Sequence, residues 1–285
     1  MNLLRIHAQP GRAATWTLSW FLFAAGVALY FYTTQQRHRE NPDDRVTPSV
    51  SQMVQAFKDA VSKPSEEVQA DDTSASQPLW ERIRTSMLWT DSVATGRRFL
   101  ISVALLFPAV LLGLQMAMFP YIGAFFLRFC LFFDKIVALS LLPILFIAFG
   151  IDELSKIMLI VIGVAPTIIL DTYNLSKSVP SEQIVKGFTL GADDQAITYR
   201  IVLPQIMPRI LNGIRLQLKT VMCFLFAGEM IASTDGLAYR IALLRRHMGM
   251  DTILPYVLWV ALLLFLVDLG MNVLNRKLHP WFQEA

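Results

Sequence analysis

Four charged residues interrupt stretches of the sequence that are otherwise apolar. Asp134 and Lys135 lie in one apolar stretch, and Lys219 and Glu229 lie in another. A charge at the centre of a bilayer costs on the order of a few kcal/mol unless it is paired or hydrated. Asp134 and Lys135 are therefore either a mutual pair or part of a polar pathway. Glu229 is a candidate for a gate or for the pathway itself.

A second candidate for chemistry is a short polar segment, residues 180–204, between two apolar stretches. Pro180 and Ser181 can open a short helix, and Gly191 can close it in a left-handed conformation. Asp193 or Asp194 can cap a second short helix. We expect this second helix to expose an apolar stripe before Pro204 starts the next long helix. Such a stripe suits a groove on a soluble partner, or it lies on lipid headgroups; its predicted members are Ile197, Ile201 and Val202.

The composition is that of a membrane protein. Hydrophobic residues make up 54% and charged residues 16%, and the mean hydropathy is +0.48; soluble domains carry about 25% charged residues. The net charge of +3 and the absence of a dense basic run argue against a nucleic-acid partner. Cys130 and Cys223 both fall in apolar stretches, so we expect neither a disulfide framework nor a metal site.

Apolar runs of roughly 20 residues, enough to cross about 30 Å of hydrocarbon, recur along the chain. We predict an all-α membrane protein with six transmembrane helices, the last five of which form a core. The predicted spans are Ala13–Tyr32, Phe99–Met118, Cys130–Phe149, Ile157–Leu170, Ile210–Ile231 and Ile253–Leu274.

The predicted division of the chain follows these spans. Residues 1–34 are a cytosolic head and first helix; that helix is too long for the core of a signal peptide and is read as an uncleaved anchor. Residues 35–95 form an external polar segment with an amphipathic helix, Ser49–Val61, and a flexible stretch, Glu66–Gln77. Residues 96–278 are the membrane core, and residues 279–285 are a cytosolic tail.

Basic residues orient the chain only in part. Six spans place both termini and residues 180–204 in the cytosol, which agrees with most basic residues. Arg240, Arg245 and Arg246 then face outward, against the rule, and an odd number of spans would move them inside. In the external position they could steer an anion or dock an acidic partner. They could equally form a solvated face.

Taken together, these stretches resemble the inner-membrane permeases of binding-protein-dependent ATP-binding-cassette (ABC) importers, of the type I fold. The resemblance is to the nitrate, sulfonate, taurine and bicarbonate branch, and it extends to a subgroup associated with urea carboxylase. It covers roughly residues 80–274. The segments that carry it are Leu142–Leu145, Phe149–Lys156, Thr189–Ala192, Ile201–Pro204, Glu229–Met230 and Gly236–Tyr239.

The resemblance implies that residues 180–204 are the coupling segment, which contacts a cytosolic ATPase. The family segment normally opens with Glu-Ala-Ala, whereas this chain has Val185-Lys186-Gly187, so any contact made by that glutamate is either missing or displaced to Glu182. It also implies pathway or gate roles for Glu229 and Tyr239. The implied ATPase-coupling residues are Glu182, Lys186, Gly187, Gly191, Ala192, Asp193, Ile201, Leu203 and Pro204.

The resemblance further implies the partners of the chain. These are cytosolic ABC ATPases, an external substrate-binding protein and a second permease, for which a homodimer is favoured over a heterodimer, all in an inner membrane with its lipid. The chain lacks a phosphate-binding loop of the G-x-x-x-x-G-K-[ST] type. ATP and Mg²⁺ are therefore expected on the ATPase, with no cofactor and no enzymatic activity in this chain.

The implied function is passage of a small polar solute, either an anion such as nitrate, a sulfonate or bicarbonate, or a guanidine- or urea-like compound. Two other classes stay open. A secondary transporter would show repeated halves and broken helices, and no repeat is visible. A transport-inactive scaffold or sensor with the permease fold would explain the altered Glu-Ala-Ala.

Overall fold

The computed structural model describes residues 12–40, 48–62, 84, 86–246 and 249–282. All regular elements assigned within these ranges are helices, as predicted. The predicted flexible stretch Glu66–Gln77 lies outside the described residues. So do residues 1–11 of the predicted cytosolic head and residues 283–285 of the predicted tail.

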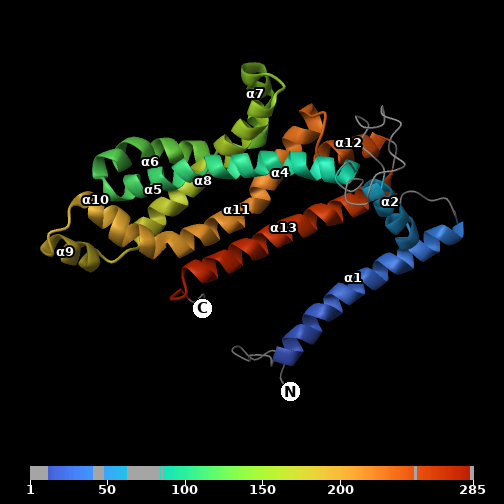
Figure 1. Cartoon of the computed structure of the whole chain (residues 1–285), viewed down its shortest axis with the longest axis horizontal. Coiled ribbons are helices and arrows are strands. Elements are labelled where there is room, and N and C mark those ends of the chain that lie inside the picture. The colour runs from blue at the N-terminus through green and yellow to red at the C-terminus, as the bar shows by residue number, and fades with distance from the viewer. Residues whose placement is uncertain (1–11, 41–47, 63–83, 85, 247–248, 283–285) are drawn as a thin grey trace.

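Long helices lie side by side around α8, which spans Glu153–Lys177 (Figure 1). Their apolar side chains meet in one main core. Buried members of this core include Leu114, Ile160, Val164 and Leu225. The helices packed around α8 are α4 (Met87–Leu105), α5 (Phe107–Met118), α6 (Pro120–Asp134), α7 (Leu142–Phe149) and α11 (Leu203–Ala232).

Within the described ranges, four helical stretches are long and apolar enough to cross a membrane, and a bent helix pair raises this number to five. The predicted six spans are therefore not confirmed as a count. The predicted first span lies in α1, Arg12–Glu40, which is not among the four. The four are Met87–Met118, Glu153–Lys177, Asp194–Ala232 and Met250–Leu278, the last of which is helix α13.

The predicted third span, Cys130–Phe149, is wrong as a continuous helix. Helix α6 begins earlier, at Pro120, and ends at Asp134, and the chain then bends by 86° before Ala138–Phe149. Proline has no N–H and favours the first turn of a helix. Pro120 and Pro143 both occupy first-turn positions, in α6 and α7, so the apolar run is divided into two helices.

The amphipathic helix predicted at Ser49–Val61 is confirmed as α2, Val50–Ser62. It packs against α13, where the ring centroids of Phe57 and Trp259 lie 6.0 Å apart. Because α4 already begins at Met87, the predicted boundary between external segment and membrane core, at residues 95 and 96, falls inside a helix.

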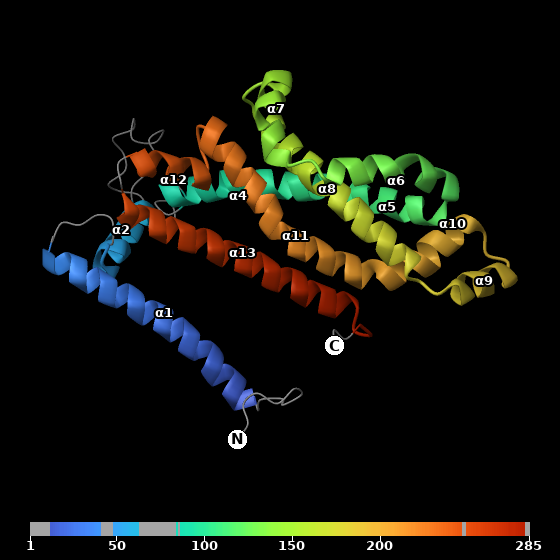
Figure 2. The same ribbon diagram turned by 180° about the vertical axis from the view of Figure 1, so that it is seen from behind.

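The molecule has two distinct ends, which α11 connects. Helices α9 (Ser181–Thr189) and α10 (Asp194–Ala196) lie at one end, and α12 (Leu237–Arg246) lies with α2 at the other (Figures 1 and 2). Helix α13 returns from the α12 end, so that its C-terminus points back toward the α9 end (Figure 2).

Candidate functional sites: an end segment and a buried ionic network

The backbone of the end segment, residues 180–204, is built as its sequence predicts. Ser181 opens α9, and Gly191 adopts a φ of 82°, which L-residues with a side chain rarely adopt. The side chain of Asp193 accepts a hydrogen bond from the Ala196 N–H at 2.9 Å and caps α10. Glycine and aspartate therefore fix the turn that lets α9 stand apart from the long helices.

The predicted exposed stripe of Ile197, Ile201 and Val202 is wrong. Ile197 and Val202 are buried at 1% and 0% exposure, and Ile201 is half-buried. The reason is that residues Ile197–Val202 do not form a separate short helix but continue into α11 through π-helical turns. Their apolar side chains thereby join the main core.

Helix α9 contacts these turns through Gly187. A Cβ atom at Gly187 would lie 2.9 Å from Ile201 Cδ1 and 3.2 Å from Ile197 Cγ1, closer than ordinary packing allows. The apolar residues that α9 and its C-terminal end leave exposed are instead Val185, Phe188 and Leu190, at 58%, 49% and 88%. The surface available to a partner is thus on α9, one helix earlier than the predicted stripe.

The remaining predicted coupling residues are distributed over both sides of the turn. Glu182, Lys186 and Pro204 are exposed, and Leu203 is half-buried at the start of α11. The N–H of Ala192 donates to the carbonyl of Gly187 at 3.1 Å and thereby tightens the end of α9.

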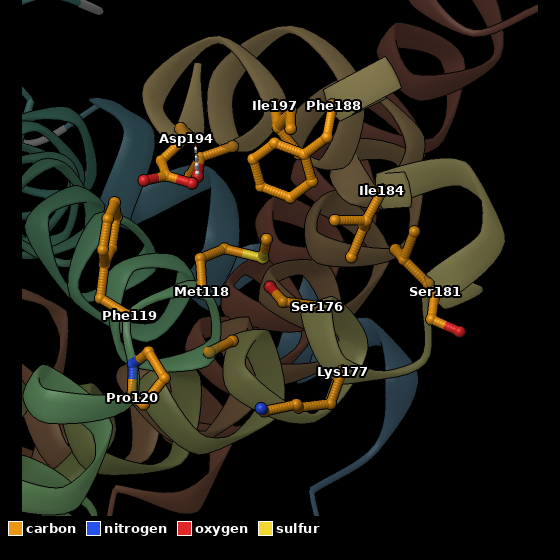
Figure 3. A pocket seen from close by; sticks show the side chains of 13 residues that line it. Met118, Phe119, Pro120, Ser176, Lys177, Ser181, Ile184, Phe188, Asp194 and Ile197 are labelled. Carbon is orange, nitrogen blue, oxygen red and sulfur yellow. Dashed lines mark hydrogen bonds between the residues drawn. The ribbon is translucent and has the colours of Figure 1, made fainter. Parts of the chain in front are cut away.

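A cleft of about 430 Å³ separates α9 from the junction of α5 and α6 (Figure 3). Phe188 and Ile184 of α9 line it on one side, and Phe119 and Pro120 line it on the other. Interior packing is normally dense, with few voids larger than a water molecule. The side of α9 that faces the α5–α6 junction is therefore loosely held.

At the opposite end of α11, an ionic network joins four parts of the chain. Its centre, Arg98 of α4 with Glu229 of α11, is buried, whereas the side chains of Glu153 and Asp235 are 53% and 48% exposed. Its Nη1 donates to Glu229 Oε1 of α11 at 2.9 Å and to the carbonyl of Asp235 at 3.0 Å. Its Nε and Nη2 donate to the Glu153 carboxylate of α8 at 2.5 and 2.7 Å. Nη2 also donates to the Asp235 carboxylate. The guanidinium fork thus holds three carboxylates.

Glu229 is fully buried, at 0% exposure. Besides Arg98, it accepts from the Thr95 hydroxyl at 2.9 Å and from the Ala238 N–H at 3.2 Å. Gly236, with a φ of 114°, brings the backbone against this pair; a Cβ there would lie 2.8 Å from both Arg98 Nη1 and Glu229 Oε2. The start of α12 is therefore bound to the middle of α4 and to the end of α11.

A second buried pair adjoins the first. Arg240 Nε of α12 donates to Asp91 Oδ2 of α4 at 2.9 Å, and their side chains are 14% and 2% exposed. The prediction that Arg240 is a free external charge is thus wrong, because α12 packs on α4. Arg245 and Arg246 are exposed, and Tyr239 is half-buried.

Asp134 and Lys135 pair with each other at 3.0 Å, which is one of the two predicted alternatives. Asp134 also accepts from the Thr167 hydroxyl at 2.9 Å. The structure places both residues at the bend after α6 rather than within a straight span. They are not close enough to form an ion pair with Glu229.

Sequence reasoning missed most of the network. Only Glu229 was predicted as a site residue with buried charge, and its partner Arg98 is 131 residues away. One signal was available. The polar residues of α4 that become buried recur every three or four positions, as one face of a helix does; they are Asp91, Thr95, Arg98 and Ser102.

Other proteins resemble this chain over most of its length. Residues 109–282 match the family described as binding-protein-dependent transport system inner membrane component. The taurine transport system permease protein TauC of Escherichia coli (strain K12) is 30% identical over 202 residues, 70% of this chain and 72% of the relative. The putative aliphatic sulfonates transport permease protein SsuC of Bacillus subtilis is 29% identical over 143 residues, 50% of this chain and 52% of the relative.

The fold is also found among solved structures. An inward-facing conformation of the MetNI methionine ABC transporter includes a chain that matches with a TM-score of 0.57 at 17% identity. The match covers 67% of this chain and 96% of that chain. Members of the family are non-enzymatic membrane subunits whose ATPase is a separate chain. This chain therefore belongs to the family of inner membrane components of binding-protein-dependent transport systems, and it is a permease subunit of an ATP-driven importer.

Proposed function

We propose that the chain couples a cytosolic ATPase to solute passage through its end segment, residues 180–204. The observation that carries the proposal is the shape of this segment. Helix α9 stands out from the bundle on the Gly191 turn and exposes Val185, Phe188 and Leu190. Apolar residues exposed on a short helix suit a groove on a soluble protein. In this proposal Glu182 and Lys186, also exposed on α9, contact the ATPase at the rim of that groove.

The proposed orientation places α9 and both chain termini in the cytosol and α12 outside. The course of α13, which returns toward the α9 end and finishes with Arg276 and Lys277 in its last turn, supports this orientation. The external substrate-binding protein then meets the α12 end. Arg245 and Arg246 are the exposed charges proposed for docking it.

The ionic network is the proposed outer clamp of the pathway. It ties α4, α8, α11 and the start of α12 together through Arg98 and Glu229, and Tyr239 lies on the same short helix. A displacement of α9 can then shift the start of α11 while Glu229, near its other end, stays held in the network. This supports a gate role for Glu229 and Tyr239, acting by position rather than by direct contact with the solute.

The complete importer, in this proposal, contains two copies of this chain, two ATPases that bind ATP and Mg²⁺, and one binding protein. The solute is a small polar compound. Relatives are named for taurine and aliphatic sulfonates, which favours a compact anionic solute over a guanidine-like one.

The experiment compares Gly191→Val with Gly191→Asn in the complex purified into nanodiscs. Asparagine tolerates the left-handed conformation, whereas valine is strained there. We expect an ATPase to copurify with the wild-type chain and with Gly191→Asn, and its hydrolysis to respond to the binding protein. Gly191→Val should release the ATPase or abolish that response. Failure of any ATPase to associate with the wild-type chain would refute the proposal.

A further inference from the structure

Lys219 is a charge that neither candidate site uses. It lies on the face of α11 that the rest of the chain leaves uncovered. Leu216, Cys223 and Met230, spaced three to seven residues apart, are exposed on α11 with it, and Leu216 is 69% exposed. Positions spaced by three, four and seven residues share one side of a helix, so these residues form a continuous stripe, the open face of α11.

The depth of Lys219 decides what this face can contact. Leu203 lies 16 residues before it and Ala232 lies 13 residues after it in α11. At about 1.5 Å per residue, both helix ends are about 20 Å or more away. Lys219 is also nine residues after the start and twelve residues before the end of the predicted span Ile210–Ile231, about 14 Å and about 18 Å along the helix. Its charge therefore lies well inside the stretch that we expect the hydrocarbon to surround. A charge at this depth normally faces protein or water, because lipid does not solvate it.

Within the described chain no carboxylate lies within 4.0 Å of Lys219. Arg215, one turn earlier, provides the contrast, since its Nε pairs with Asp268 of α13 at 3.0 Å. Arg215, which is turned toward α13, is thus neutralised by a carboxylate of the same chain. Lys219, on the open face, is not neutralised by any described carboxylate. Asp171 of α8 lies beside Gly213 and Ile214, between one and two turns closer to the α9 end.

We propose that the open face of α11 lines the water-filled passage of the importer and that Lys219 selects solutes with an anionic head group. The inference rests on the proposed function and deepens it by naming the substrate class. An ammonium group in a narrow passage with low-dielectric walls attracts anions and repels cations over the whole width of the passage. Water in the same passage hydrates the group when no solute is present.

Cys223 supplies a native probe, because it is exposed one turn beyond Lys219 on the same face. The second cysteine, Cys130, is buried and can be replaced by alanine. In the nanodisc complex, the rate of Cys223 modification is measured with two membrane-impermeant methanethiosulfonates, one carrying a sulfonate and one a quaternary ammonium. Their rate ratio reports the local electrostatic potential.

We expect both reagents to modify Cys223 and the anionic one to be favoured. Lys219→Gln should lower the anionic-to-cationic rate ratio by at least about threefold, and Lys219→Arg should retain it. Leu216→Gln, on the same face without a change of charge, is the matched control and should leave the ratio unchanged. Asp171→Asn should not lower it. Transport of a sulfonate should fall in Lys219→Gln in parallel with the rate ratio.

Two outcomes would overturn the inference. Protection of Cys223 from both reagents, with and without ATP, would mean that the open face of α11 is dry. An unchanged rate ratio in Lys219→Gln would mean that the charge does not act in the passage. Copurification of the ATPase, measured on the same preparations, separates these results from failure of the proposed function. The inference can fail while the ATPase is still bound.

Discussion

The two ends of α11 are held in opposite ways. At the α12 end, Arg98, Glu229, Asp91 and Arg240 are largely buried and each is paired with a residue of another helix. At the other end, α9 contacts the turns before α11 through Gly187, borders a cleft and exposes apolar side chains. Paired buried charges fix a geometry and tolerate little change, whereas a loosely packed helix can move with a partner. The α12 end is therefore the more rigid of the two, which agrees with the proposal that the α9 end couples the chain to an ATPase.

The largest expected effect is at the centre of the network. Glu229→Ala removes the fully buried carboxylate of the network and leaves the Thr95 hydroxyl and the Ala238 N–H without this acceptor. Arg98 keeps Glu153 and Asp235, so the loss should approach but not exceed the cost of breaking an isolated buried pair, about 3–5 kcal/mol. We expect a large fall in the thermal unfolding temperature of the purified chain. Glu229→Gln keeps a side chain of nearly the same shape and should lower the unfolding temperature less than Glu229→Ala does. Equal stability of wild type and Glu229→Ala would contradict the conclusion that the ionic network stabilises the α12 end.

A smaller loss is expected at the second pair. Arg240→Ala leaves the Asp91 carboxylate, 2% exposed, with the Gly236 N–H as its one remaining hydrogen-bond donor among the described residues. An unsatisfied buried group costs about 1–3 kcal/mol, and more when it is charged. Arg245→Ala, at an exposed position in the same helix, is the control and should change stability by less than about 0.5 kcal/mol. Similar losses in both variants would argue against a buried role for Arg240.

The anchoring of α9 is tested by side-chain size at Gly187. Gly187→Ala requires Ile201 to shift by a few tenths of an ångström, whereas Gly187→Leu cannot fit against Ile197 and Ile201. We expect Gly187→Leu to displace α9 and to weaken ATPase association, with only a modest loss of thermal stability. Protease sensitivity within residues 181–191 provides the direct readout. Full ATPase binding by Gly187→Leu would show that the anchor is dispensable.

The smallest effect on stability is expected at the exposed tip. Leu190 is 88% exposed, so Leu190→Glu should change stability by less than about 0.5 kcal/mol. It should nonetheless weaken ATPase association strongly, because a carboxylate is costly in an apolar groove. Leu190→Met preserves the apolar surface and should bind normally. The contrast between the two ends is clearest if Glu229→Ala lowers thermal stability more than it weakens ATPase association. Leu190→Glu should then weaken ATPase association with little change in stability.

Several local features could be predicted from the sequence alone. Gly191 closes α9 in the left-handed region and Asp193 caps α10, because both effects depend on residues close together in the chain. The amphipathic pattern of α2 was equally local. The third span was misread because apolar composition does not show a bend. The prolines at 120 and 143, and the charges Asp134 and Lys135 at the bend itself, were its local signs.

The sequence by itself determined an all-helical membrane protein and a capped, glycine-linked segment between two apolar stretches. Composition and short-range hydrogen bonding are sufficient to specify these features. Only the tertiary structure decided that Glu229 forms an ion pair with Arg98 and that Arg240 forms one with Asp91. It also decided that Lys219 stays exposed on the open face of α11. These outcomes depend on which helices pack together over separations of more than a hundred residues. Which helices pack together is determined by burial of the apolar side chains of the whole core, and it cannot be read from any single segment.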